Sequence, residues 1–253
     1  MKMQPVKYVA EVSPVKEVTL HGTADLAYWR EKLAAENLQP LAADGLAQVF
    51  VSATEARFMG ITFRESLIGI HVQPTSTMPE GMPAMFLIQA WNSLSAFAWI
   101  ERTMFGTPYA AGKIAVEPKF PASLELSQRG ERLITAAMSA ESQQSTETAE
   151  ENWHGAIFLP RRKGGKQTLF VAKLAGLTEH FSFRAGDTFE LVGIGCGVCP
   201  SPQPFPRSAE ERKRGDAVGS LLDSHFSPRA WHVRQAAAHA KSKTYRADQF
   251  FGG

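Results

Sequence analysis

The sequence predicts an α+β protein built around a large, strongly curved or closed sheet. Short segments rich in β-branched and aromatic residues follow one another through residues 1–200, with turn residues between them. Only two segments in that part of the chain have apolar residues at helical spacing. A chain with many strands and few helices can bury its apolar residues when its sheet curves or closes on itself, so we expect a curved or closed sheet.

The strands are expected in two groups. Apolar and polar residues alternate over residues 6–12 and 15–22, which predicts two strands broken at Ser13-Pro14. Three longer strands are expected over residues 46–58, 60–72 and 84–92. Shorter strands separated by turns or polar loops are expected over residues 112–118, 122–127, 131–140, 152–160, 167–176, 179–184 and 187–194.

Two helices are expected among these strands. Residues 24–36 form an amphipathic helix that Asp25 can cap, and residues 93–105 form a mostly buried helix that ends at Gly106. The polar tract over residues 139–152 lies between two of the later strands. It is expected to be a flexible excursion that carries no chemistry.

The character of the chain changes after residue 200. We expect a first domain over residues 1–200, a linker over 202–207, and two helical segments over 208–226 and 228–246. Residues 201–253 hold nine Lys or Arg and five Asp or Glu, a net charge of +4. This basic helical extension is predicted to dock on its own domain, on a second subunit of a homo-oligomer, or on an acidic partner.

Composition and motifs exclude several classes of protein. The net charge is only +2 and there are no nucleic-acid motifs, so the sequence does not indicate nucleic-acid binding. No apolar run suits a signal peptide or a membrane helix, and we therefore expect a cytoplasmic protein. Cys196 and Cys199 have redox or half-zinc spacing, yet two thiolates cannot complete a zinc site, which favours a tightly packed turn. His225, His232 and His239 recur every seven residues, about 10 Å apart on a helix, too far for one metal ion. We therefore expect no metal and no organic cofactor.

Glu65 is the residue that most needs an explanation. It lies in an apolar strand, on the same face as Phe63 and Leu67. A carboxylate in apolar surroundings needs a nearby cation or has a raised pKa suited to proton transfer. Glu65 is therefore a general acid or base, or a structural carboxylate paired with Arg102 or Lys113.

The segments FRES at residues 63–66, IER at 100–102 and FGTPY at 105–109 resemble the acetoacetate decarboxylase superfamily. In that family a strand reading YTES supplies an active-site Glu, and a helix with an RE pair leads into a YPKK turn whose first Lys forms a Schiff base. The specific matches lie within residues 60–116. The resemblance implies a cone-like β-barrel with packed helices, a deep and mostly apolar pocket, and the C-terminal helical extension outside it.

The resemblance also assigns residues to roles. Glu65 corresponds to the active-site Glu and Glu101 to the Glu of the RE pair, whereas Thr107 stands where the Schiff-base Lys is expected and Pro108 replaces its neighbour. Lys113, later in the turn, is a displaced Schiff-base lysine, an ion-pair partner of Glu65 or Glu101, or a solvent-facing lysine. The further substrate-binding candidates are Lys16, Arg64, Trp91, Asn92, Phe105, Thr107 and Tyr109.

Three hypotheses follow for function. The first is a cofactor-independent lyase or decarboxylase-like enzyme that acts on a small organic acid or carbonyl compound through Glu65, with an imine at Lys113. The second is a barrel that binds a small ligand without turnover, because Thr cannot supply the amine that imine chemistry needs. The third places the function in the basic extension, as a docking device in a homo-oligomer.

Overall fold

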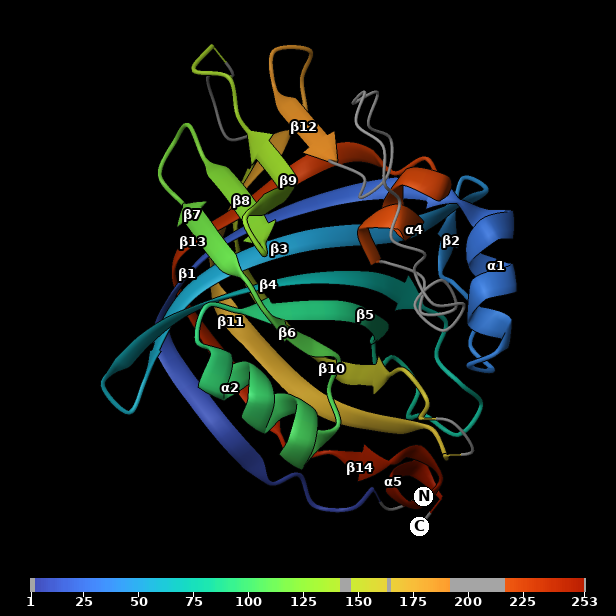
Figure 1. The fold of residues 1–253 in the computed structure, drawn as a ribbon. Coiled ribbons are helices and arrows are strands. Elements are labelled where there is room, and N and C mark those ends of the chain that lie inside the picture. Colours follow the sequence, from blue (N-terminus) through green and yellow to red (C-terminus); the bar gives the residue numbers. More distant parts are fainter. Residues whose placement is uncertain (1–2, 142–146, 163–164, 192–216, 253) are drawn as a thin grey trace, which may run out of the picture.

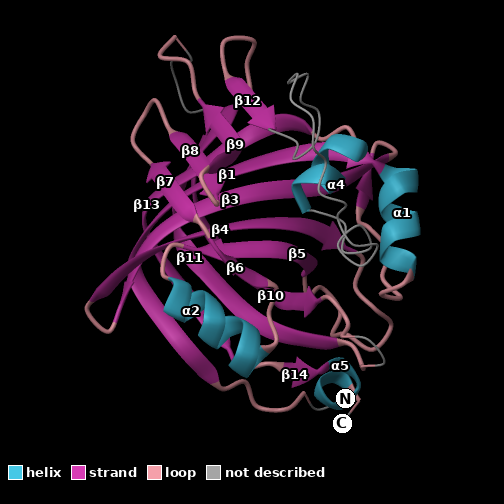
Figure 2. Ribbon diagram, in the orientation of Figure 1, coloured by secondary structure: helices cyan, strands magenta, loops and turns pink. Residues whose placement is uncertain are grey.

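The computed structural model describes residues 3–141, 147–162, 165–191 and 217–252 as mainly strands (Figures 1 and 2). In this part of the chain ten strands form the larger sheet. They are β1 (Tyr8–Asp25), β2 (Ala42–Ala43), β3 (Leu46–Phe58), β4 (Ile61–Val72), β5 (Ala84–Asn92), β6 (Tyr109–Ala111), β10 (Glu147–Leu159), β11 (Thr168–Ser182), β13 (Ser227–Ser242) and β14 (Tyr245–Arg246).

The larger sheet closes into a ring. Its order is β1-β13-β11-β10-β5-β4-β3-β2, and β1 pairs with β3 as well as with β13. Most neighbours are antiparallel, whereas β5 pairs in parallel with β10 and with β6. Because the inner faces of the ring strands are turned toward one another, side chains from strands far apart in the sequence meet in its interior.

A second, four-stranded sheet packs on the outside of the ring, over β1, β3 and β4 (Figure 1). It consists of β7 (Lys113–Glu117), β8 (Ser123–Gln128), β9 (Glu131–Ala137) and β12 (Thr188–Leu191). Much of the main apolar core lies between the two sheets, where Val18, Leu20, Ile68, Leu126 and Ile134 are fully buried. Burial of such side chains contributes about 25 cal/mol per Å² of apolar surface, so this layer is a main source of stability.

The helices in the described part of the chain are few and short (Figure 2). They are α1 (Leu26–Ala34), α2 (Ser95–Ile100), which continues as the π-helical turn η1 (Glu101–Phe105), α4 (Ala217–Asp223) and α5 (Ala247–Phe251). The Asp25 side chain accepts a hydrogen bond from the Tyr28 backbone and caps α1, as the sequence predicted. Among the described residues, no helix is long and apolar enough to cross a membrane.

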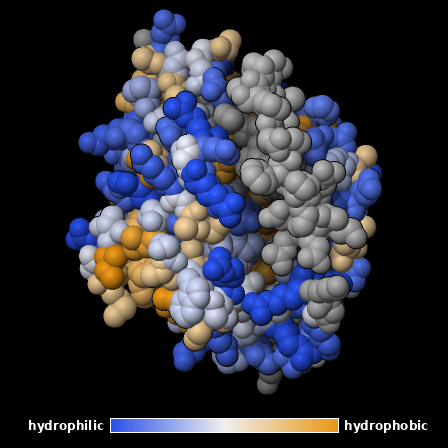
Figure 3. All heavy atoms as spheres, viewed as in Figure 1, coloured by the Kyte–Doolittle hydropathy of each residue, from blue (hydrophilic) through white to orange (hydrophobic). Residues whose placement is uncertain are grey.

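The segment over residues 93–105 differs from the prediction. It is helical and ends at Gly106, but Ala98 is its buried residue, whereas Trp99, Ile100 and Met104 are exposed. Apolar side chains gather over α2 on the face shown in Figure 3. An apolar helix sequence therefore predicted burial that the single chain does not provide.

Two strand predictions also need correction. The predicted break at Ser13-Pro14 is an irregularity within one long strand, β1, whose register with β13 shifts between Val12 and Glu17. The polar tract was expected to be an excursion, yet its second half begins β10, where Glu147 to Asn152 pair with β11. Polar residues are compatible with a strand here because several of them face solvent or the interior of the ring.

The prediction of two C-terminal helices is wrong for residues 227–242, which form β13. The boundary at residue 200 and the linker lie outside the described residues, as do Cys196 and Cys199. Of the first predicted helix, residues 217–223 form α4, and the second is replaced by a strand paired on both edges, with β1 and with β11. The Ala-rich segment has helix propensity, but pairing along two strands overrides it.

Candidate functional site

The interior of the ring contains a cavity of about 720 Å³. All seven strands of the closed ring contribute to it, and α2, η1 and β6 line one side. Much of its wall is apolar, but four carboxylates, four histidines of β1, β4 and β13, and the cations Lys173, Arg234 and Lys241 also face it. A mostly apolar cavity with a few convergent polar groups is typical of a small-molecule site.

Lys241 is the central amine of this cavity. Its Nζ contacts the Glu101 carboxylate, and its side chain is only 16% exposed. The rings of Phe170, Tyr109 and Phe105 surround the amine, with their centroids 4.7, 5.2 and 5.6 Å from Nζ. The amine is therefore held between a carboxylate and aromatic walls that limit the access of water.

Thr107 completes this arrangement from the end of η1. It is buried, and its hydroxyl donates a 2.8 Å hydrogen bond to Oε2 of Glu101, the oxygen that Lys241 also contacts. Thr107 thus orients the carboxylate that pairs with Lys241. The position where the family resemblance expects a lysine carries a hydroxyl, whereas β13 brings the amine of Lys241 into the cavity.

Glu65 faces the same cavity from β4. Its Oε1 accepts a 3.0 Å hydrogen bond from Asn92, on the adjacent strand β5. Burial raises the pKa of Glu65 above its ordinary value of 4.5; Lys241 opposes this rise and Glu101 adds to it. Burial and the charges of Glu65 and Glu101 also raise the pKa of Tyr109 well above its ordinary value. Glu65 is therefore suited to hold and release a proton.

The inward position of Lys241 depends on an irregularity in β13. Arg234 and Lys241 are an odd number of residues apart, so in a regular strand their side chains would face opposite sides of the sheet. The register of β13 with β1 shifts twice between Glu17 and Val12, and that with β11 shifts between Glu179 and Ala175. These shifts let both cations face the cavity.

A second cluster of charges lies on β1, β10 and β13. Arg234 contacts the carboxylates of Glu17 and Glu151, and His239 Nε2 lies 2.7 Å from Oε2 of Glu17. Burial alone would raise the pKa of Glu17, but the hydrogen bond and charge of His239, together with Arg234, hold the pKa at about 2. The cluster therefore keeps Glu17 ionised inside the protein.

Histidines extend this cluster along the cavity. His21 lies between His71 and His232, with ring centroids 6.1 and 4.1 Å away. Burial, followed by the positive charge that neighbouring histidines would carry, lowers the pKa of His21 well below its usual value. Burial and then His180 lower the pKa of His232 to about 4, so His21 and His232 are neutral near pH 7.

The structure brings five of the predicted residues together. As strand alternation predicted, Phe63, Glu65 and Leu67 share the face that lines the cavity. The predicted site residues in the cavity wall are Glu65, Asn92, Glu101, Phe105 and Tyr109. Phe50 also faces the cavity, and Thr107 contacts Glu101 from outside its lining.

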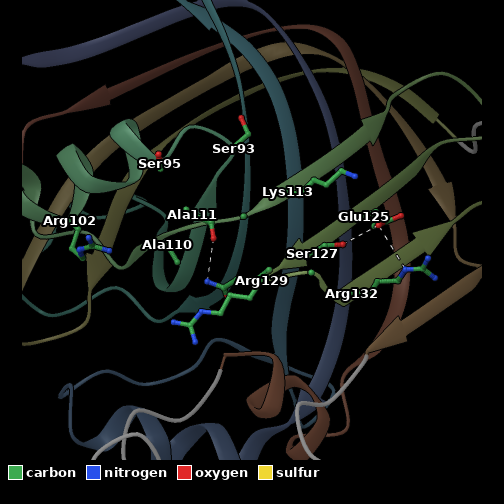
Figure 4. A pocket seen from close by; sticks show the side chains of 13 residues that line it. Ser93, Ser95, Arg102, Ala110, Ala111, Lys113, Glu125, Ser127, Arg129 and Arg132 are labelled. Atoms are coloured by element: carbon green, nitrogen blue, oxygen red, sulfur yellow. Dashed lines mark hydrogen bonds and ion pairs between the residues drawn. The ribbon is translucent and has the colours of Figure 1, made fainter.

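The other predicted residues lie elsewhere. Lys113 was expected to be able to reach the cavity of Glu65, but it is exposed on β7, in the outer sheet. With Arg102, Arg129 and Arg132 it lines a separate surface groove of about 810 Å³ (Figure 4). Its strand belongs to the other sheet, so it cannot supply an amine to the ring interior.

Lys16 and Arg64 also lie away from the cavity. Both are about half exposed and pair with Glu55, at 2.8 and 2.6 Å. Trp91 is buried in the core and donates a hydrogen bond to Gln128. None of the three belongs to the lining of the cavity.

Sequence reasoning missed the residues that β13 and β10 supply. Lys241, Arg234, His232 and His239 lay in the segment predicted to be a helix, and Glu151 lay in the polar tract. A usable signal existed in residues 231–234, where Trp231 and Val233 are buried in the core while His232 and Arg234 face the cavity. The irregularity that turns Lys241 inward leaves no comparable pattern.

Comparisons with known proteins agree with this architecture. No family model and no curated protein matches the chain. Among solved structures, the enduracididine biosynthesis enzyme MppR superimposes with a TM-score of 0.58 at 14% identity, covering 97% of this chain and 90% of that one. Acetoacetate decarboxylase from Legionella pneumophila gives 0.57 at 12% identity, with coverages of 97% and 90%. An acetoacetate decarboxylase-like enzyme from Sphingomonas wittichii gives 0.51 at 13% identity, with coverages of 93% and 91%.

The ring of strands, its outer sheet and its interior cavity therefore belong to a mostly-sheet α+β architecture. More particularly, the chain has the acetoacetate decarboxylase-like fold, as the resemblance of its FRES, IER and FGTPY segments predicted. At this level of identity the likeness concerns the fold, and the chemistry must be argued from the side chains in the cavity.

Proposed function

We propose that this protein is a lyase or decarboxylase-type enzyme that acts on a small carbonyl compound or oxo acid, with Lys241 as the imine-forming amine. The observation that carries the proposal is the position of Lys241, which contacts Glu101 in the same cavity as Glu65. Imine chemistry requires an amine inside the substrate cavity, and Lys241 replaces both the missing family lysine and Lys113 in that role.

The residues around Lys241 suit each step of such a reaction. Lys241 transfers a proton to Glu101, and its amine attacks the carbonyl carbon of the substrate. Loss of the carbonyl oxygen as water leaves a protonated imine, which withdraws the electron pair of a neighbouring bond. In a 3-oxo acid that bond joins the carboxylate, so carbon dioxide leaves and an enamine remains.

Glu65 is the proposed acid for the second half of the reaction. A carboxyl group whose pKa is raised holds its proton closer to neutral pH and can deliver it to the enamine carbon. Water then hydrolyses the imine, which releases the product and restores the Lys241 amine. Asn92 fixes the Glu65 carboxyl through its 3.0 Å hydrogen bond, so the proton donor has a defined position.

The structural neighbours support this substrate class. MppR was solved with pyruvate and with a condensation product of pyruvate and an imidazole carboxaldehyde, and other neighbours are acetoacetate decarboxylases. Carbonyl compounds are common to these ligands and names. In this proposal the closed ring is a barrel whose interior holds such a ligand. The exposed apolar side chains of α2 and η1 support the separate expectation of a homo-oligomer.

Borohydride trapping tests the role of Lys241. Wild-type protein is incubated with a panel of 2-oxo acids, 3-oxo acids and uncharged ketones, reduced with borohydride, and measured by intact mass and peptide mapping. We expect a substrate-dependent adduct on the peptide that contains Lys241, and none in Lys241→Ala. Lys113→Ala is the matched control, because it removes an exposed lysine outside the cavity and should leave the adduct unchanged.

The other outcomes separate the alternatives. An adduct that persists in Lys241→Ala and disappears in Lys113→Ala would contradict the assignment. If the panel gives no adduct, while a carbonyl ligand still raises the melting temperature of the wild type, the protein binds small ligands without imine chemistry.

A further inference from the structure

Glu151, His180 and His232 form a cluster beside the charged residues already described. They lie on the adjacent strands β10, β11 and β13, and His180 and His232 are register partners. Oε1 of Glu151 is 3.2 Å from Nε2 of His180 and 3.7 Å from Nδ1 of His232. One carboxylate oxygen therefore faces two imidazole nitrogens at once.

The two imidazoles also contact each other, which limits where protons can lie. Nδ1 of His180 and Nε2 of His232 are 3.1 Å apart, so one of them donates to the other. Each neutral imidazole carries one ring proton, and one of the two protons lies between the rings. Only one proton is then left for the two ring nitrogens that face Oε1 of Glu151. Whichever ring donates, one nitrogen lone pair faces the carboxylate oxygen, and a cation between them would remove this repulsion.

The spacing suits a small divalent ion. Ligand bonds of 2.0–2.1 Å in a tetrahedral site put neighbouring ligand atoms about 3.4 Å apart. The separations of 3.2 and 3.7 Å lie on either side of this value, and one ligand atom from each residue lies within 4.8 Å of the others. Two His and one carboxylate form the ligand set of many sites that keep one position open.

Arg234 orients the carboxylate for this role. It contacts Oε2 of Glu151, which leaves Oε1 directed at the two histidines. Its own charge is balanced by Glu17, so the guanidinium does not place an uncompensated positive charge beside the cluster. Such a contact to the second carboxylate oxygen is typical of the groups that fix metal ligands.

We infer that Glu151, His180 and His232 bind a divalent transition-metal ion such as Zn²⁺, with an open coordination position toward the cavity. Glu151 and His232 line the cavity wall, and all three side chains are 20 to 28% exposed, so an ion can enter. The inference is independent of imine chemistry at Lys241, and it differs from the expectation of no metal.

The test is metal binding by the chelator-treated full-length protein. Thiolates also bind zinc, so all titrations use a Cys196→Ser, Cys199→Ser background. Calorimetry with Zn²⁺ is expected to give one ion per chain, and Co²⁺ is expected to give the visible absorption of a low-symmetry site. His180→Ala and Glu151→Gln should weaken binding by at least about tenfold, which corresponds to 1.4 kcal/mol.

His154→Ala is the matched control, because it removes an exposed histidine of β10 and should leave Zn²⁺ binding unchanged. If Glu151→Gln does not fold, since Glu151 also contacts Arg234, then His180→Ala decides, because it leaves that contact in place. Lack of saturable binding in the Ser background would overturn the inference. So would equal affinity in His180→Ala and in the background protein.

Discussion

Glu17 shows how a single residue can tie the cavity to the stability of the fold. It is 3% exposed and contacts Arg234 and His239, both from β13, and the Thr19 hydroxyl donates a 2.8 Å hydrogen bond to it. Removing one partner from a buried ion pair typically costs about 3–5 kcal/mol, because the remaining charge stays buried. The Glu17 cluster is therefore both part of the site and part of the fold.

We predict that Glu17→Gln lowers the free energy of unfolding by about 3 kcal/mol near neutral pH. The folded pKa of Glu17 is about 2, below its ordinary 4.5, so between these values the unfolded chain binds more protons at this position. This contribution to stability is fully present above the unfolded pKa and is lost as the pH falls through the folded pKa. The difference between wild type and variant should therefore be largest above about pH 5 and shrink in acid, as measured by urea unfolding over a pH series.

Glu55→Gln is the control for this prediction. Glu55 pairs with Lys16 and Arg64 on the outside of the ring, where those partners are about half exposed. Exposed ion pairs contribute about 0–1 kcal/mol, so this variant should change stability little. Equal losses in the two variants would contradict the buried-pair argument.

At the residue scale, the sequence predicted the side of the site that lies in residues 60–116. Glu65 was found because a carboxylate in an apolar strand is conspicuous, and strand alternation placed Phe63 and Leu67 on its face correctly. Lys241 could not be found in the same way, because its inward position depends on register shifts of β13. Lysines in polar segments mostly face solvent, as Lys113 does.

At the scale of elements, β13 is the clearest difference between prediction and structure. Its Ala236-Ala237-Ala238 segment has high helix propensity, and the segment contains no turn residue between Arg229 and Ser242. Propensity contributes only tenths of a kcal/mol per residue, whereas β13 has backbone partners along both edges and buries Trp231 and Val233. Pairing partners more than 50 residues away cannot be recognised from local pattern.

Gly176 of β11 provides a test of the irregularity in β13. Its φ is +156°, and a Cβ at this position would lie 2.9 Å from Cα of Ala237. We predict that Gly176→Ala destabilises the protein by about 1–3 kcal/mol, because the backbone of β13 must move away. Since Lys241 follows on the same strand, the yield of the borohydride adduct should also fall.

Gly130→Ala is the matched control for Gly176→Ala. Gly130 also has positive φ, at +84°, but a Cβ there has no atom within 4 Å. The Gly130→Ala variant should lose only about 1 kcal/mol of stability, because alanine tolerates this positive φ less well than glycine, and the adduct yield should not change. Thermal unfolding and adduct yield are measured together, and an unchanged yield in Gly176→Ala would count against the role of the irregularity.

At the scale of the whole molecule, composition and element count predicted a mostly-sheet α+β protein, which is confirmed. The strands over residues 46–92 were predicted nearly to their ends, because their apolar and aromatic content is high. The role of the C-terminal segment was not predicted. Ring closure needs β13 between β1 and β11, and closure is a long-range property that no single segment encodes.

Closure therefore gives the C-terminal segment a structural role that a docking extension would not have. We predict that a chain truncated after residue 216 does not fold into a stable ring. The truncation exposes the paired edges of β1 and β11 and removes Trp231, Phe250 and Phe251 from the core, in addition to Arg234 and Lys241 from the cavity. Each fully buried aromatic side chain contributes about 3–5 kcal/mol, so the loss of three is comparable with a typical net stability of about 5–15 kcal/mol. The two unpaired strand edges add to this loss.

The measurements are near-ultraviolet circular dichroism, thermal unfolding and size-exclusion chromatography of the purified chain. A chain that lacks only Gly252 and Gly253 is the control and should unfold cooperatively like the wild type, because α5 already ends at Phe251. The truncated chain should show no cooperative transition and should aggregate through its open edges. A folded truncated protein with an altered oligomeric state would instead favour the docking hypothesis, because the ring would then be stable without β13.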